Sequence, residues 1–146
     1  LYSAAVGHHF ARPGNRFWRS LHAAGFTQSL LSPFEDRDLL KFGYGLTNIV
    51  ARATARADEL KAEELILGQQ QLAVKIKQYQ PQFLAILGIS AYRTALERPQ
   101  AVIGRQDELL SGATVWVLPN PSGLNAHYQL ADLTRVYREL LLATSN

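Results

Sequence analysis

Gln-Phe-Leu-Ala-Ile-Leu-Gly-Ile at residues 82–89 is a continuous apolar run. A run of this length predicts a strand that is buried on both faces of a parallel sheet. Ser90 follows at the position of a helix N-cap, so we expect a helix to begin at Ala91. Ala-Thr-Val-Trp-Val-Leu at residues 113–118 repeats the apolar pattern. The chain therefore contains at least two strands of a buried sheet.

Helical patterns lie around these strands. Proline suits the first turn of a helix because it fixes φ and lacks a donor, so helices are expected to begin at Pro13 and Pro33. Apolar residues at helical spacing predict two more helices, over residues 59–79 and 130–142. Residues 44–50 follow Gly43 and are rich in β-branched and apolar residues, so they predict a further strand. Strands that alternate with helices indicate an α/β fold, an open and mostly parallel sheet with helices on both faces.

The composition limits the possible functions. At 146 residues with 47% hydrophobic content, the chain has the size of one domain, residues 1–146. Its 15 basic and 12 acidic residues give a net charge of +3, which fits a polyanionic partner without requiring one. The absence of cysteine excludes disulfides, thiolate zinc sites and cysteine nucleophiles, and favours an intracellular setting. No apolar run approaches the length of a membrane span.

A glycine and three flat rings follow one another in Gly7-His8-His9-Phe10. Neighbouring histidines rarely point the same way, and no third ligand stands at a suitable spacing, so a metal site is disfavoured. The pattern favours a surface on which planar groups stack.

The loop at residues 119–127 joins a buried strand to the last helix and carries Leu124 between Gly123 and Asn125. Two interpretations stand at this point. Leu124 is either a leucine tucked into the core from a tight turn or an apolar wedge of the kind that unstacks DNA bases.

Five motifs, taken in order, resemble the mismatch-specific uracil/thymine DNA glycosylases of the uracil-DNA glycosylase superfamily. They are Gly-His-His-Phe at 7–10, Pro-Gly-Asn-Arg-Phe-Trp at 13–18, Gly-Leu-Thr-Asn at 45–48, Gln-Pro-Gln-Phe-Leu-Ala-Ile-Leu-Gly at 80–88 and Leu-Pro-Asn-Pro-Ser-Gly-Leu at 118–124. The resemblance implies a three-layer α/β/α sandwich around a short, mostly parallel sheet. It further implies a monomer that excises uracil or thymine from double-stranded DNA with G:U or G:T mismatches, without metal or other cofactor and away from membranes. The expected setting is the bacterial cytoplasm, in association with the nucleoid.

The resemblance also assigns a base pocket. The loop from Gly7 through His9 to Phe10 would hold the flipped base, with the Phe10 ring stacked on it. Asn48 would hydrogen-bond the polar edge of the base. Ser3 would lie where the 5-position of the pyrimidine points, which favours uracil over thymine because thymine-excising relatives carry a smaller residue there. The alternatives are core packing for Phe10 and a turn contact for Asn48.

The same resemblance gives the second loop a role on the duplex. Leu124 would enter the gap left by the extruded base, with backbone groups of Gly123 and Asn125 facing the widowed guanine. Asn120 and Ser122 would lie at the pocket rim, although Asn and Ser favour turns whatever the function.

The residue that positions the attacking water is expected outside the sequence. The chain has no methionine, so Leu1 is not expected to be the native start. The resemblance implies that an asparagine in a Gly-x-Asn-Pro motif holds the water, at the end of a first strand that is expected immediately upstream of Leu1. Within the chain, Asp58 is the carboxylate nominated as substitute or helper; its alternative role is to complement a helix dipole. A silent mismatch-binding module of the same fold is the second hypothesis. A nucleotide-processing enzyme is the third, although no phosphate loop or dinucleotide fingerprint is present.

Overall fold

The computed structural model describes Phe10, residues 14–47 and residues 62–145. The chain divides into two compact units. The first, which we call the helical unit, comprises Leu1–Thr47 and Pro121–Asn146, and the second, the sheet unit, comprises Asn48–Asn120. Each unit is described by itself.

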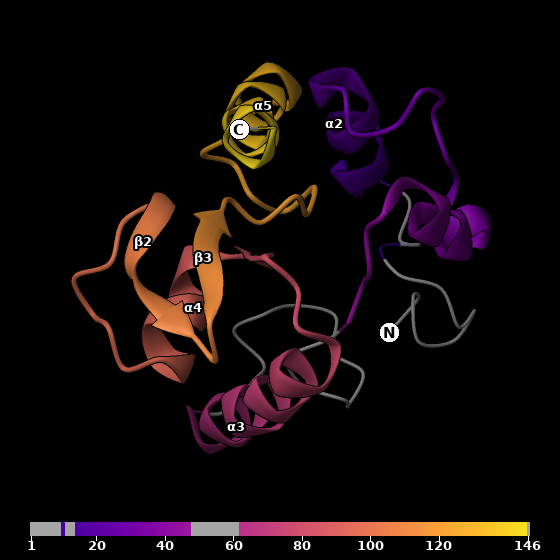
Figure 1. The fold of residues 1–146 in the computed structure, drawn as a ribbon. Helices are drawn as coiled ribbons and strands as arrows, with labels where there is room; N and C mark the ends of the chain where they lie inside the picture. The colour runs from indigo at the N-terminus through magenta and orange to yellow at the C-terminus, as the bar shows by residue number, and fades with distance from the viewer. Residues whose placement is uncertain (1–9, 11–13, 48–61, 146) are drawn as a thin grey trace. The chain divides into compact units, whose positions relative to one another are not determined.

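A three-stranded sheet organises the sheet unit (Figure 1). Its strands are β1 (Phe83–Leu87), β2 (Gly104–Leu110) and β3 (Ala113–Leu118), in the spatial order β1-β3-β2. β1 runs parallel to β3, and β2 runs antiparallel to it. Together with its helices, this sheet confirms the α/β class that the sequence predicts.

The two predicted buried strands differ in how deeply they are buried. β3 is central, and five of its six residues are buried, so both of its faces are covered as predicted. In β1 only Ile86 is buried and Ala85 is exposed. Burial of β1 on both faces is therefore wrong for the described part of the chain, where β1 is an edge strand with one neighbour.

Among the residues that the structure describes, two helices pack with this sheet. They are α3 (Ala62–Tyr79) and α4 (Ile89–Ala95). Their apolar side chains form one cluster with the strands, whose buried members are Leu72, Ile76, Ile86, Tyr92, Leu110, Ala113, Val115 and Val117. The predicted helix over residues 59–79 is confirmed from Ala62 onward, and residues 59–61 lie outside the described residues.

Two local features of the sheet unit differ from prediction. α4 begins at Ile89 after Gly88, not at Ala91 after a Ser90 cap. The reason is that Gly88, with φ of 133°, turns the chain at once while its N–H bonds to the carbonyl of Leu118 at 2.8 Å. β2 was not predicted, because its sequence Gly-Arg-Gln-Asp-Glu-Leu-Leu is polar and lacks β-branched residues.

The described residues of the helical unit form the helices α2 (Phe17–Ala24), the 3₁₀ helix η1 (Pro33–Phe42) and α5 (Leu130–Thr144). α2 packs against α5, and the buried side chains on these two helices include Phe17, Trp18, Leu21, Leu133, Val136, Tyr137 and Leu140. The helices predicted at Pro33 and at residues 130–142 are confirmed.

Helix α2 begins at Phe17 rather than at Pro13. Gly14 has a φ of 89°, a left-handed conformation that a helix cannot contain. The Asn15 side chain then accepts the Phe17 N–H at 2.9 Å, so it satisfies a donor of the first turn.

The strand predicted over residues 44–50 is wrong for residues 44–47, which form no ladder. The Tyr44 N–H is bonded to the Leu39 carbonyl at 3.0 Å as part of the end of η1. Its ring lies edge-on to Phe26 at 5.4 Å. Residues 48–50 lie outside the described residues. Within the described part of the chain, no helix is long and apolar enough to cross a membrane.

Candidate nucleic-acid interface

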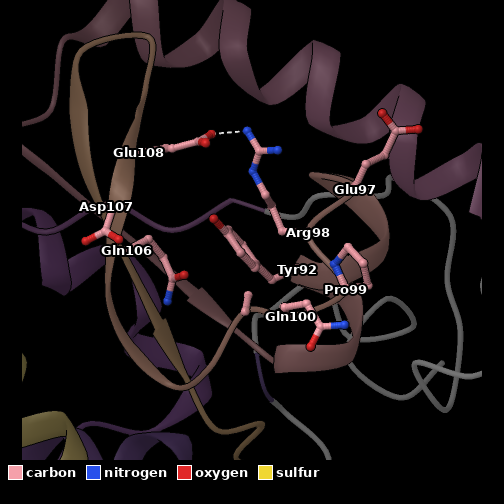
Figure 2. A pocket seen from close by; sticks show the side chains of 9 residues that line it. Tyr92, Glu97, Arg98, Pro99, Gln100, Gln106, Asp107 and Glu108 are labelled. Carbon is pink, nitrogen blue, oxygen red and sulfur yellow. Dashed lines mark hydrogen bonds and ion pairs between the residues drawn. The ribbon is translucent and has the colours of Figure 1, made fainter.

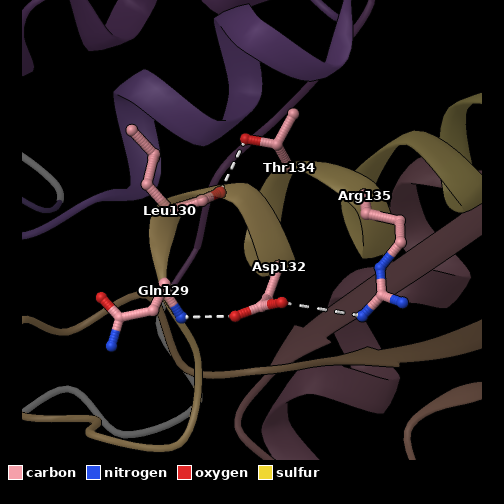
Figure 3. Close-up of polar contacts among 5 residues, drawn as sticks. All are labelled: Gln129, Leu130, Asp132, Thr134 and Arg135. Carbon is pink, nitrogen blue, oxygen red and sulfur yellow. Dashed lines mark hydrogen bonds and ion pairs between the residues drawn. The ribbon is translucent and has the colours of Figure 1, made fainter.

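Residues 121–129, which we call the wedge loop, lead into helix α5 and present Leu124 to solvent. The Leu124 side chain is 60% exposed, so the interpretation of a leucine tucked into the core is wrong. At the far end of the loop, the Asp132 carboxylate accepts the Gln129 N–H at 2.9 Å and lies 4.0 Å from Arg135 (Figure 3). The acidic group also suits the positive end of the helix dipole. The loop therefore ends on a fixed helix terminus.

Side chains inside the wedge loop close two small turns. Ser122 Oγ accepts the Leu124 N–H at 3.1 Å, and Asn125 Oδ1 accepts the His127 N–H at 3.1 Å. The Asn125 N–H bonds to the Ser122 carbonyl at 3.0 Å. Ser122 and Asn125 thus have the turn chemistry that their residue types favour, and that chemistry fixes the backbone on either side of Leu124.

Arg16 holds the wedge loop from outside. Its backbone N–H donates to the Pro121 carbonyl at 2.9 Å. Its guanidinium donates to the carbonyls of Pro121 at 3.4 Å, Ser122 at 2.7 Å and Asn125 at 3.1 Å, and also to that of Tyr128. One side chain therefore gathers four carbonyls from both sides of Leu124, which the planar fork of arginine permits.

Gly123 lies directly against Gly14. A Cβ at Gly123 would stand 2.7 Å from the Gly14 carbonyl oxygen and 3.3 Å from its carbon. Real Cβ atoms do not approach backbone this closely, so the loop needs glycine here for the close contact. The predicted duplex residues Ser122, Gly123, Leu124 and Asn125 are thus brought together on one loop, which the segment 14–16 supports.

Phe10 packs on the same segment. Its ring stacks on Phe17 with centroids 4.1 Å apart and planes at 22°, and Phe17 meets Trp18 edge-on at 5.0 Å. Phe17 is 4% exposed whereas Phe10 is half-buried. Phe10 has a φ of 54°, an uncommon conformation for a residue with a Cβ. The ring thus rests on the core by one face and is only partly enclosed.

Asn120 lies at the carboxyl end of β3 in the sheet unit. A Cβ at Gly88 would meet Asn120 Cβ and Nδ2 at 3.9 Å, and the Gly88 N–H bonds to Leu118. Gly88 follows β1, which is parallel to β3. Asn120 is therefore at the shared carboxyl edge of two parallel strands, where α/β proteins bind their ligands.

The remaining predicted residues lie outside the described part of the chain. They are Ser3, Gly7, His9, Asn48 and Asp58. Among the described residues, no group of three or more His, Asp or Glu side chains is placed to hold a metal ion.

A surface cavity of about 310 Å³ lies in the sheet unit beside α4 and β2 (Figure 2). Arg98 and Glu108 point toward each other and form an ion pair there. Burial, followed by the nearby Glu108 charge, raises the pKa of Tyr92, while Arg98 acts in the opposite direction. Asn120 does not line this cavity. No pattern in the sequence predicted the cavity.

A sheet with a parallel strand pair, together with its helices, defines the chain as an α/β protein. Residues 1–141 match the family model of the Uracil DNA glycosylase superfamily. The chain belongs to that superfamily, whose typical activity is the hydrolytic removal of uracil from DNA in repair.

Proposed function

We propose that this protein excises uracil, and thymine as a second substrate, from G:U and G:T mismatches in double-stranded DNA. The observation that supports this most is the exposed Leu124 on a loop whose backbone is held by Arg16, Gly14 and its own turns. An apolar side chain fixed in this way is suited to enter a base stack. A mismatched base is extruded at lower energetic cost than a paired one, which supports the preference for mismatches.

In this proposal Leu124 fills the space from which the base has left. Gly123 contributes backbone groups toward the widowed guanine, because it has no side chain to obstruct them. Asn125 fixes the loop, since its N–H is bonded to Ser122 and its carbonyl to Arg16. Ser122 stabilises the turn that carries Leu124.

The base pocket proposed here includes Phe10 as its stacking platform. One face of its ring is covered by Phe17, and the residue is only half-buried, which supports a second stacked ring. Its positive φ costs on the order of 1–3 kcal/mol, and strain of this kind often accompanies ligand sites. The pocket roles that the resemblance implies for Ser3, Gly7, His9, Asn48 and Asn120 are part of the same proposal.

The reaction is hydrolysis of the bond between base and sugar. The bond between the anomeric carbon and the ring nitrogen breaks with its electron pair going to the base, and water adds to the anomeric carbon. The water gives up one proton and becomes the sugar hydroxyl, and the base anion takes up one proton and leaves as the free base. Donors directed at the departing base and a group that orients the water would lower the barrier. For the water we propose an asparagine upstream of Leu1, with Asp58 as helper or substitute.

The test is uracil release by the full-length protein from a G:U duplex. We expect an abasic product, and we expect Phe10→Ala to slow its formation on the order of a hundredfold, as loss of a positioning contact does. Phe34→Ala, at a phenylalanine 67% exposed on η1, is the matched control and should retain the wild-type rate. Wild-type activity of Phe10→Ala would refute the proposal that Phe10 is the stacking platform of the base pocket. Mismatch binding without any abasic product would instead support a silent binding module.

A further inference from the structure

The motif Pro-Gly-Asn-Arg-Phe-Trp at residues 13–18 carries part of the resemblance, but no role has been assigned to it. In the structure its residues Gly14 and Arg16 contact the wedge loop, and Phe17 contacts Phe10. This one short segment therefore contacts both the wedge loop and the stacking platform of the proposed pocket.

We propose that Arg16 is a positioning residue that sets the conformation of the wedge loop and thereby the insertion of Leu124 into the duplex. This inference rests on the proposed function, since it assigns a residue that acts through Leu124. Arg16 itself neither contacts a base nor takes part in the hydrolysis.

The contacts distinguish this role from the commoner role of an arginine in a DNA-binding protein, which is a phosphate contact. The guanidinium donates to carbonyls before and after Leu124, namely those of Pro121, Ser122 and Asn125. Its Nη1 donates to Tyr128. All three of its nitrogens are thus used inside the protein, and the residue is half-buried.

Four carbonyls converging on one group also explain why arginine is required. A planar guanidinium offers five N–H donors in a fixed fork, whereas a lysine ammonium offers three donors from a single atom. Lysine would preserve the positive charge but would not reach carbonyls spread over residues 121–128. Charge and geometry are therefore separable by substitution.

The experiment is a double-mutant cycle on binding of the full-length protein to a G:U duplex that carries a fluorescent base next to the uracil. Its variants are Arg16→Met, Arg16→Lys, Leu124→Ala and Arg16→Met with Leu124→Ala. We expect both Arg16 variants to weaken mismatch binding and base unstacking on the order of tenfold. The double variant should be no weaker than Leu124→Ala, because both changes remove the same insertion.

Salt dependence and amide exchange provide readouts that a phosphate contact or a general loss of stability would not reproduce. Arg16→Met should leave the slope of log K against log salt unchanged, whereas loss of one phosphate contact would reduce it by about 0.9. The Leu124 and Asn125 amides, each bonded to Ser122, should lose exchange protection in both Arg16 variants while amides in the core of α5 keep theirs.

Three results would overturn the role of Arg16: wild-type binding by Arg16→Met, full rescue by Arg16→Lys, or additive effects with Leu124→Ala. Each of these presupposes a wild-type protein that binds the mismatch through Leu124. The proposed function would instead be refuted if the wild-type protein showed no mismatch preference, or if Leu124→Ala left its affinity for the mismatch unchanged. If Arg16→Met does not fold, Arg16→Lys and its exchange protection decide the question alone.

Discussion

Leu124 is distinguished from other exposed leucines by the hydrogen bonds that fix the backbone around it. Single exposed leucines are ordinary on protein surfaces, and Leu142 on α5 is 57% exposed with no implied role. Leu124 differs because the backbone on both sides of it is bonded to Arg16 and to Ser122. An apolar side chain in a fixed place can enter a base stack without first ordering its own loop, which would cost conformational entropy.

Gly123 provides a direct test of this fixed geometry. In Gly123→Ala the new Cβ would stand 2.7 Å from the Gly14 carbonyl oxygen, so the loop must move away from residue 14. We expect uracil release from a G:U duplex to fall on the order of tenfold or more, as displacement of a positioning element does. Ala126→Ser, at an exposed position of the same loop, is the control and should match wild type. A wild-type rate for the Gly123→Ala variant would show that the contact with Gly14 is dispensable.

At the scale of elements, the packing of α2 on α5 buries polar atoms. Ser20 Oγ and Tyr137 Oη are buried and have no hydrogen-bond partner among the described residues. Burial raises the pKa of Tyr137 well above its usual range, and the nearby Arg16 charge acts in the opposite direction to a smaller extent. The hydroxyl is therefore held neutral within this helix pair.

This gives a pH dependence of defined sign. In the unfolded chain Tyr137 loses its proton near pH 10, but in the folded protein it keeps it, so stability should fall as the pH rises above about 10. Tyr137→Phe should remove that contribution and change the free energy of unfolding at pH 7 by no more than about 1 kcal/mol, because no hydrogen bond to a described residue is lost. Urea unfolding at pH 7 and at alkaline pH measures both effects.

The control for this experiment is Tyr79→Phe, at a tyrosine that is 74% exposed at the end of α3. It should retain the alkaline loss of stability seen in the wild type. The interpretation fails if Tyr137→Phe loses stability between neutral and alkaline pH as steeply as the wild type does.

Elements with a strong pattern were predictable from the sequence, and those fixed by tertiary contacts were not. The apolar run at residues 82–89 forms a strand at Phe83–Leu87, the run at 113–118 forms a strand, and the helical spacing over 130–142 forms a helix. β2 was not predicted because its sequence is polar. It is a strand because it pairs with β3 after the turn at Ser111 and Gly112. The strand predicted over residues 44–50 rests on Thr47, Ile49 and Val50, which are β-branched, whereas Tyr44 at its start is used to end η1.

At the scale of the whole molecule, the sequence predicted where two of the candidate residues lie, while the site roles of all of them stay predictions. Asn120 lies at the expected sheet edge, and Leu124 is exposed on the expected loop. The role of Arg16 was not predictable, because its partners are backbone carbonyls more than a hundred residues away and leave no signal in residue types. Ser3, Asn48 and Asp58 remain predictions from the resemblance.

Membership of the uracil DNA glycosylase superfamily indicates the activity, and the wedge loop supports a duplex substrate. We propose that Leu124, on a loop held by the segment 14–16, assists the removal of uracil from a mismatch.

The most direct test compares uracil release from a G:U duplex by the full-length wild type, Leu124→Ala and the exposed-leucine control Leu142→Ala. We expect an abasic product from the wild type and from Leu142→Ala at equal rates, and a rate lower on the order of tenfold or more for Leu124→Ala. Equal rates for all three proteins would contradict the proposed role of Leu124.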